Sequence, residues 1–221
     1  MIELTKIKYW LFDLDNTLYS GDTKVFDQVD KKMSKFISEK LKVSIEEAKK
    51  IQKNYFHEYN TTLNGMIKNH EIDADEFLDF VHDVDLDFLK ADKPLEQEIS
   101  NLVGKKFIFT NGSKAHASNV TKRIGIEKLF DGVFDIVESD FIPKPSIEPY
   151  KKIIEKYKIE PQYSIFIEDI ARNLKPAHEL GMKTVWIKND EPWAAEFSDS
   201  NFINYKTDNL AKFLKEINEL R

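Results

Sequence analysis

The sequence predicts an α/β fold in which a parallel sheet forms the core and a small all-helical cap is inserted after the first strand. Two observations carry this prediction. From residue 106 onward, short apolar runs alternate with helical patterns, as in parallel sheets covered by helices on both faces. Residues 24–102, in contrast, are helical in pattern and contain no convincing strand. With 221 residues, the chain has room for a core domain of roughly 100–150 residues and such an insert.

The expected elements follow from local patterns along the chain. The first strand lies within residues 7–14 (IKYWLFDL), a run rich in aromatic residues. In the insertion, Ser44 and Asp73 are suited to begin helices, and Gly181 is suited to end one. Later strands are expected at 106–109, 133–136, 164–167 and 183–187, and helices at 113–124, 149–157, 174–180 and 209–219. We therefore assign residues 1–18 and 91–221 to the core and residues 19–90 to the cap.

Composition limits the classes of function. The net charge of −6 disfavours a nucleic-acid polymer as partner, although a small anion could still bind in a local positive pocket. The chain has no cysteine, which excludes disulfides and thiolate chemistry. Its first residues lack the apolar segment of a signal peptide, and no apolar run reaches the roughly 18 residues of a membrane helix. We expect a cytoplasmic protein without a membrane partner.

Two carboxylates, Asp13 and Asp15, follow the first predicted strand. Like charges this close are costly unless a cation or a proton compensates them, and Mg²⁺ with oxygen ligands is the simplest compensation. Phosphoryl transfer to a carboxylate needs a nucleophile and an acid for the leaving oxygen, and these two side chains could supply both. An Asx turn that starts a helix explains the same residues equally well.

Three further polar clusters lie at predicted loops. Thr110 and Asn111 follow the second strand and could hold phosphate oxygens, although Asn-Gly is also a common turn. Lys144 lies between two prolines, on a stiff segment that would aim its ammonium group, but taken alone it reads as a surface lysine. Glu168 and Asp169 follow another strand and could complete an oxygen-lined metal site with Asp13, or merely cap a helix.

In their order along the chain, these clusters resemble the four signature motifs of the haloacid dehalogenase-like (HAD) hydrolase superfamily, whose core is Rossmann-like. The resemblance covers nearly the whole chain. A narrower similarity to the pyrimidine 5′-nucleotidase branch is carried by FDLDNTLY (12–19), HEYNTTLNGM (57–66), FTNGSKAHA (109–117), KPSIEPY (144–150) and FIEDIARNLKPAHELGMKTVWI (166–187). Two positions depart from that pattern: Ile170 stands where a small hydroxyl residue is expected, and Asn60 where glycine is usual.

The resemblance implies a mechanism. Asp13 attacks phosphorus and becomes an aspartyl phosphate. Asp15 protonates the leaving alkoxide and then activates water. Mg²⁺ is held by the carboxylates of Asp13 and Asp169 and the backbone carbonyl of Asp15, with Glu168 beside it. The phosphoryl group is bound by Thr110, Asn111 and Lys144.

Several alternatives stay open. The favoured substrate is a nucleoside 5′-monophosphate, but the motifs read only the phosphate, so a sugar phosphate or pyridoxal phosphate would fit equally. A dehalogenase would not need Asp15, because halide leaves without a proton. A non-catalytic binding protein on this scaffold would be expected to lack some of these residues, and none is missing. The five histidines show no metal-ligand spacing, and Tyr55 and Phe56 are expected to pack within the cap.

Overall fold

A computed structural model describes residues 4–220. Its centre is a sheet of six parallel strands in the order β3-β2-β1-β4-β5-β6, which confirms the α/β prediction. The strands are β1 (Tyr9–Phe12), β2 (Lys105–Phe109), β3 (Gly132–Phe134), β4 (Ser164–Glu168), β5 (Lys183–Ile187) and β6 (Tyr205–Thr207). From β1 the chain runs outward through β2 to β3 and then returns to the other side of β1 for β4. This is the strand order of Rossmann-type sheets, with a switch point between β1 and β4.

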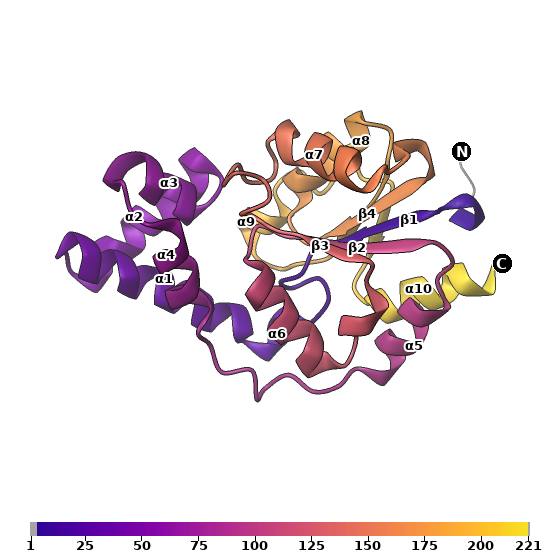
Figure 1. The fold of residues 1–221 in the computed structure, drawn as a ribbon, viewed down its shortest axis with the longest axis horizontal. Helices are drawn as coiled ribbons and strands as arrows, with labels where there is room; N and C mark the ends of the chain where they lie inside the picture. Colours follow the sequence, from indigo (N-terminus) through magenta and orange to yellow (C-terminus); the bar gives the residue numbers. More distant parts are fainter. Residues whose placement is uncertain (1–3, 221) are drawn as a thin grey trace.

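Helices cover both faces of the sheet (Figure 1). One face carries α5 (Lys93–Asn101), α6 (Lys114–Ile124) and α10 (Leu210–Glu219), and the other carries α7 (Ile147–Tyr157) and α8 (Leu174–Glu179). The remaining short helices are η1 (Leu4–Lys6), η2 (Gly21–Thr23), η3 (Glu127–Leu129), η4 (Pro161–Tyr163), η5 (Ala171–Asn173) and α9 (Pro192–Ala195).

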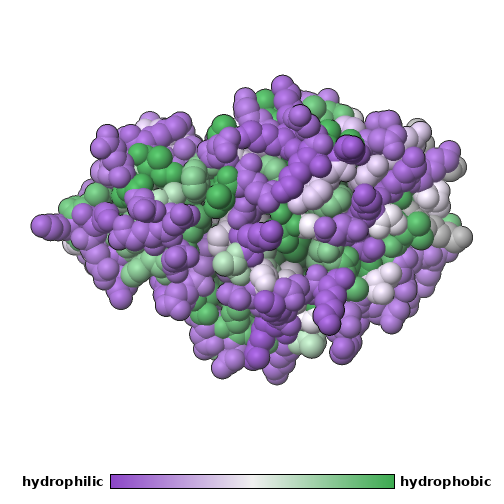
Figure 2. All heavy atoms as spheres, in the orientation of Figure 1, coloured by the Kyte–Doolittle hydropathy of each residue, from purple (hydrophilic) through white to green (hydrophobic). Residues whose placement is uncertain are grey.

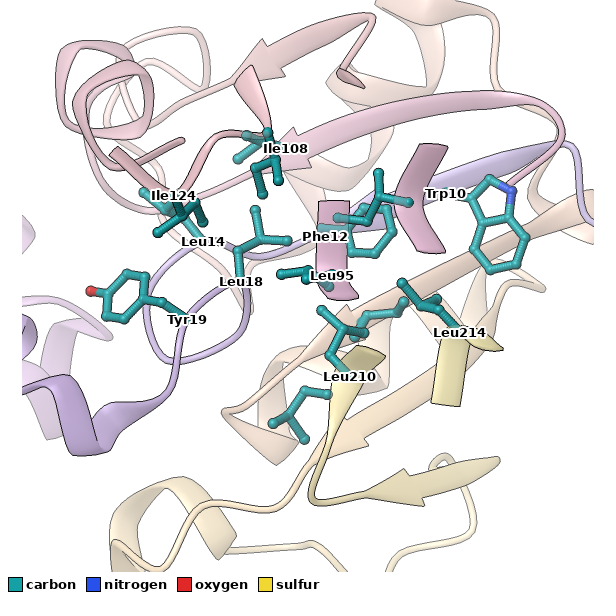
Figure 3. Close-up of a cluster of buried hydrophobic side chains, with 14 of the residues drawn as sticks. Trp10, Phe12, Leu14, Leu18, Tyr19, Leu95, Ile108, Ile124, Leu210 and Leu214 are labelled. Atoms are coloured by element: carbon teal, nitrogen blue, oxygen red, sulfur yellow. The ribbon is translucent and has the colours of Figure 1, made fainter. Parts of the chain in front are cut away.

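Strand β1 is buried on both faces because its side chains alternate between two cores. Trp10 and Phe12 pack in the cluster formed with α5, α6 and α10 (Figure 3), whereas Leu11 packs in the cluster under α7 and α8. A strand covered in this way reads as a continuous apolar run, which is why it was recognisable in the sequence.

The cap is a separate group of four helices at one end of the sheet (Figure 1). They are α1 (Val25–Leu41), α2 (Ile45–Tyr59), α3 (Thr62–His70) and α4 (Ala74–His82), and they enclose their own apolar cluster. The expected caps are present: the Ser44 side chain accepts a hydrogen bond from the Glu47 amide, and Asp73 accepts from the amides of Asp75 and Glu76. All four helices lie within residues 19–90; those boundaries themselves remain a prediction.

The structure shortens one predicted strand and adds one strand that was not predicted. The strand expected at 133–136 ends at Phe134, because Asp135 leaves the sheet and its carboxylate accepts hydrogen bonds from the Lys114 and Glu138 amides. Ile136 then packs with the cap cluster instead. Strand β6 was not predicted, since it has three residues and none of them is fully buried.

The helix predicted at 174–180 ends one residue earlier, at Glu179. Gly181 follows with a φ of 96°, as expected for a glycine just beyond a helix. Within residues 4–220, no helix is both long enough and apolar enough to cross a membrane.

Candidate active site

The predicted motif residues meet at the carboxyl edge of the sheet, next to the switch point. Asp13 directly follows β1, Thr110 follows β2 and Asp169 follows β4, and these three strands are neighbours in the sheet. Ligands bind at this position in open α/β sheets, because the strand order reverses there and opens a crevice.

A buried acidic cluster occupies this position. Asp13, Glu168 and Asp169 each offer a carboxylate oxygen, and these oxygens lie within 4.8 Å of one another. The Lys144 ammonium reaches into the same cluster, with Nζ 2.7 Å from Asp13 Oδ1 and 2.6 Å from Glu168 Oε2. The four side chains come from segments up to 156 residues apart in sequence, and the fold brings them together as the order of the motifs suggested.

Lys144 is held firmly in this position. Its side chain is buried, and Nζ also donates to the Phe109 carbonyl at 2.8 Å. Its backbone is clamped by the Asn111 amide group, which accepts from the Lys144 amide at 2.9 Å and donates to the Lys144 carbonyl at 3.3 Å. The Asn111 side chain therefore positions Lys144 in this structure, a role that the sequence did not suggest.

The charges of the cluster do not balance. Burial and the neighbouring Glu168 raise the pKa of Asp13 to about 7, against the opposing effect of Lys144. Burial, Glu168 and Asp13 likewise raise the pKa of Asp169 well above its usual range. Three carboxylates and one ammonium leave two uncompensated negative charges when all are ionised, and a divalent cation would neutralise them. Because all the donors are hard oxygens, the site fits Mg²⁺.

Asp169 is anchored from the neighbouring strand β5. Its Oδ2 accepts a hydrogen bond from Asn189 Nδ2 at 2.7 Å, and its carbonyl accepts from Trp186 Nε1 at 2.6 Å. Asn189 is not among the site residues predicted from the sequence. Its position just beyond the predicted strand 183–187, at the same edge of the sheet as the other motifs, could have indicated it.

Asp15 lies in different surroundings from the acidic cluster. Its Oδ1 accepts hydrogen bonds from Tyr19 Oη at 2.5 Å and from His116 Nε2 at 2.8 Å. Burial would raise the pKa of Asp15, but His116 and Tyr19 lower it to about 2. Burial would lower the pKa of His116, yet Asp15 raises it above its usual value. The spacing of the histidines in the sequence indicates no site, so His116 is a residue that only the fold brings to Asp15.

A cavity of about 340 Å³ lies over these groups, between the core and the cap. It is lined by all seven residues that the sequence nominated: Asp13, Asp15, Thr110, Asn111, Lys144, Glu168 and Asp169. Its volume falls in the range of about 300–1,000 Å³ typical of ligand pockets. In the view of Figure 2, hydrophobic surface gathers on the cap beside the core.

On the cap side of the cavity, Phe56 differs from the expectation that it packs within the cap. Phe56 does not pack only within the cap: it lines the cavity and meets Trp193 of α9 edge to face, with ring centroids 5.3 Å apart. The Arg172 guanidinium lies 4.5 Å from the Phe56 ring centroid. Asn60, where glycine was expected, has a φ of 68°, a conformation that asparagine adopts more readily than most residues.

Fold and site together define a class of protein: an α/β enzyme with an acid-rich site under a helical cap. The chain belongs to the haloacid dehalogenase-like hydrolase family, whose family model matches residues 7–181. The chain is accordingly a hydrolase.

Individual relatives support this placement. The chain is 33% identical to phosphate metabolism protein 8 of Saccharomyces cerevisiae, over 96% of this chain and 71% of that protein. It is 25% identical to glyceraldehyde 3-phosphate phosphatase of Methanocaldococcus jannaschii, over 97% of this chain and 99% of that protein. Among solved structures, a HAD phosphatase from Thermococcus onnurineus shares the fold with a TM-score of 0.62, at 21% identity over 96% of this chain and 98% of that one.

Proposed function

We propose that this hydrolase is a Mg²⁺-dependent phosphatase that cleaves small phosphate monoesters through an aspartyl phosphate on Asp13. The observation that carries the proposal is the convergence of Asp13, Lys144 and the acidic pair Glu168–Asp169 on one buried site that lines a cavity. The Asp13 carboxylate beside the Lys144 ammonium, facing a cavity, is suited to attack the phosphorus atom of a bound ester.

Each polar group then has a role. Asp13 attacks phosphorus, and the ammonium of Lys144 stabilises the negative charge of the phosphoryl oxygens. Thr110, Asn111 and the amides of the loop after β2 bind those oxygens.

Asp13 and Asp169, with the backbone carbonyl of Asp15, would hold Mg²⁺, which when bound neutralises phosphate charge. The anionic substrate also raises the pKa of Asp15, which favours the protonated form that donates to the leaving oxygen.

The cavity favours a nucleoside 5′-monophosphate as substrate. Phe56, Trp193 and Arg172 form a wall of flat groups, suited to a planar leaving group such as a base. Arg172 Nε is buried and has no hydrogen-bond partner among the described residues, so an acceptor on the substrate would satisfy it. The resemblance to the pyrimidine 5′-nucleotidase branch points the same way.

A small sugar phosphate is the second candidate. It is favoured by the similarity to a protein named glyceraldehyde 3-phosphate phosphatase, which extends over 97% of this chain. A substrate that small would leave the wall of Phe56 and Trp193 largely uncovered.

A substrate panel separates the candidates. The purified protein with Mg²⁺ is assayed for phosphate release from UMP, CMP, AMP, glyceraldehyde 3-phosphate, other sugar phosphates and pyridoxal phosphate. We expect the highest kcat/KM for a nucleotide, complete loss of activity with EDTA, and recovery on adding Mg²⁺. A preference for sugar phosphates would replace the nucleotide assignment, whereas full activity in EDTA would contradict the metal-dependent mechanism.

A further inference from the structure

A second group of polar side chains links Asp15 to the cap. His116 Nε2 lies 2.8 Å and Tyr19 Oη 2.5 Å from the same oxygen, Asp15 Oδ1. The surrounding structure holds both donors in place. His116 is buried in the first turn of α6, and Tyr19 belongs to the apolar cluster between the sheet and helices α5, α6 and α10. Figure 3 shows the Tyr19 ring at the edge of this cluster with its hydroxyl pointing away from it.

The chemistry of the contact fixes its direction. An ionised carboxylate only accepts hydrogen bonds, so the Nε2–H of His116 donates, whether or not the ring carries a second proton. The tyrosine hydroxyl donates in the same way. Since both donors reach Oδ1, the other carboxylate oxygen, Oδ2, is the one available to a substrate in the cavity that Asp15 lines.

The His116 ring is braced by the cap. It stacks on His82, with ring centroids 4.3 Å apart and an interplanar angle of 12°. His82 is the last residue of the cap helix α4, and its Nδ1 lies 3.0 Å from the Oγ of Ser113, the N-cap of α6. The ring that holds Asp15 is therefore in contact with both the core and the cap.

We propose that His116 is a positioning residue for proton transfer: it fixes the Asp15 carboxylate so that Oδ2 faces the leaving oxygen. The proposal rests on the proposed phosphatase function. As Asp13 forms its bond to phosphorus, the ester P–O bond breaks, and the proton on Asp15 Oδ2 passes to the leaving oxygen to give an alcohol. His116 stays hydrogen-bonded to Oδ1 throughout, with Tyr19 as the second donor and His82 as the brace. Without these donors the χ2 torsion of Asp15 is less restricted, because this torsion has broad energy wells in aspartate.

The test uses the basicity of the leaving group. p-Nitrophenolate departs without protonation, whereas the alkoxide of an alkyl phosphate or a nucleotide needs the proton from Asp15. The quantity to compare is kcat/KM, because it reports only the steps up to departure of the leaving group. The variants are His116→Leu, which removes the donor, and His116→Gln, whose side-chain amide can replace Nε2–H. Asp15→Asn shows the pattern expected when the acid itself is lost.

We expect His116→Leu to lower kcat/KM for alkyl phosphates by about 10–100-fold, and for p-nitrophenyl phosphate by less than about threefold. His116→Gln should recover most of the loss, and the Mg²⁺ concentration for half activation should stay unchanged in both variants. Equal losses on both classes of ester would overturn the proposal, as would a folded His116→Gln protein no better than His116→Leu.

If His116→Leu does not fold, Tyr19→Phe provides the same test, because it removes the other donor to Oδ1 and keeps the ring. It should show a smaller loss with the same dependence on the leaving group, and a loss without that dependence would overturn the proposal. Failure of the underlying function looks different: the wild-type protein would hydrolyse neither class of ester, or Asp13→Asn would retain full activity.

Discussion

Lys144 shows how one residue can serve both stability and function. The residue is 2% exposed, and its ammonium contacts Asp13 and Glu168. Burying an ammonium group costs free energy. The carboxylates of Asp13 and Glu168 offset that cost only while they are ionised. Burial would lower the pKa of Lys144, but Asp13 and Glu168 raise it, so the group stays charged over the range in which the enzyme would work.

Replacing Lys144 by Gln should therefore destabilise the Mg²⁺-free protein by about 3–5 kcal/mol, because the buried carboxylates lose their counter-charge. Urea unfolding in EDTA measures this change. Lys156→Gln is the matched control, since Lys156 pairs with Glu138 at the surface, where such a pair contributes at most about 1 kcal/mol. Equal effects of the two substitutions would contradict the account of Lys144.

Asp13→Asn should abolish turnover while leaving the fold intact. The amide has nearly the same shape as the carboxyl group and relieves the repulsion from Glu168, but it is no nucleophile. Phosphate release and circular dichroism check the two halves of this prediction. Near-normal, Mg²⁺-dependent hydrolysis by the variant would exclude Asp13 as the nucleophile.

Among the elements, the cap helices α2 and α3 depend on a close approach at Gly65. A Cβ atom built there would lie 2.3 Å from Cγ of Tyr55, well inside any real contact. The Tyr55 hydroxyl in turn lies 2.6 Å from His70 Nε2, so the ring lies along α3 and contacts it at both Gly65 and His70.

We expect Gly65→Ala to destabilise the protein by about 1–3 kcal/mol through overpacking. Gly21→Ala is the control, because the nearest atom to its added Cβ is 3.4 Å away, an ordinary contact. Chemical denaturation of both variants gives the comparison. A neutral Gly65→Ala would mean that α2 and α3 separate without loss of stability.

For the whole molecule, the acidic cluster links stability to pH and to Mg²⁺. The folded-state pKa values of Asp13 and Asp169 are raised, while in the unfolded chain both are near 3.9. Between about pH 4 and pH 7 the folded state therefore binds more protons than the unfolded state, so these groups lower stability as pH rises. A bound cation compensates the ionised carboxylates and reverses this loss.

The rise in melting temperature caused by Mg²⁺ should consequently be larger at about pH 8 than at about pH 5. Thermal unfolding in EDTA and in excess MgCl₂ at the two pH values measures it. Asp169→Asn is expected to reduce the Mg²⁺ effect at both. An equal rise at both pH values in the wild-type protein would show that the cation does not bind at these carboxylates.

The prediction from sequence succeeded where local patterns carry the information. Strand β1 was visible because both of its faces are buried, and the caps at Ser44 and Asp73 because helix starts need side-chain acceptors. It failed at β6, whose short, partly exposed run has no distinctive pattern, and at 135–136, where hydrogen bonds to Asp135 end the strand early.

The alternation of strands and helices and the order of the polar clusters can be read from the amino-acid sequence, because both depend on the spacing of nearby residues. Which of those groups contact one another depends on the folded arrangement. It placed His116 on Asp15, Asn111 on the Lys144 backbone and Phe56 against Trp193. Each of these contacts joins segments that are distant in the chain, so it forms only when the sheet, the loops and the cap have packed together.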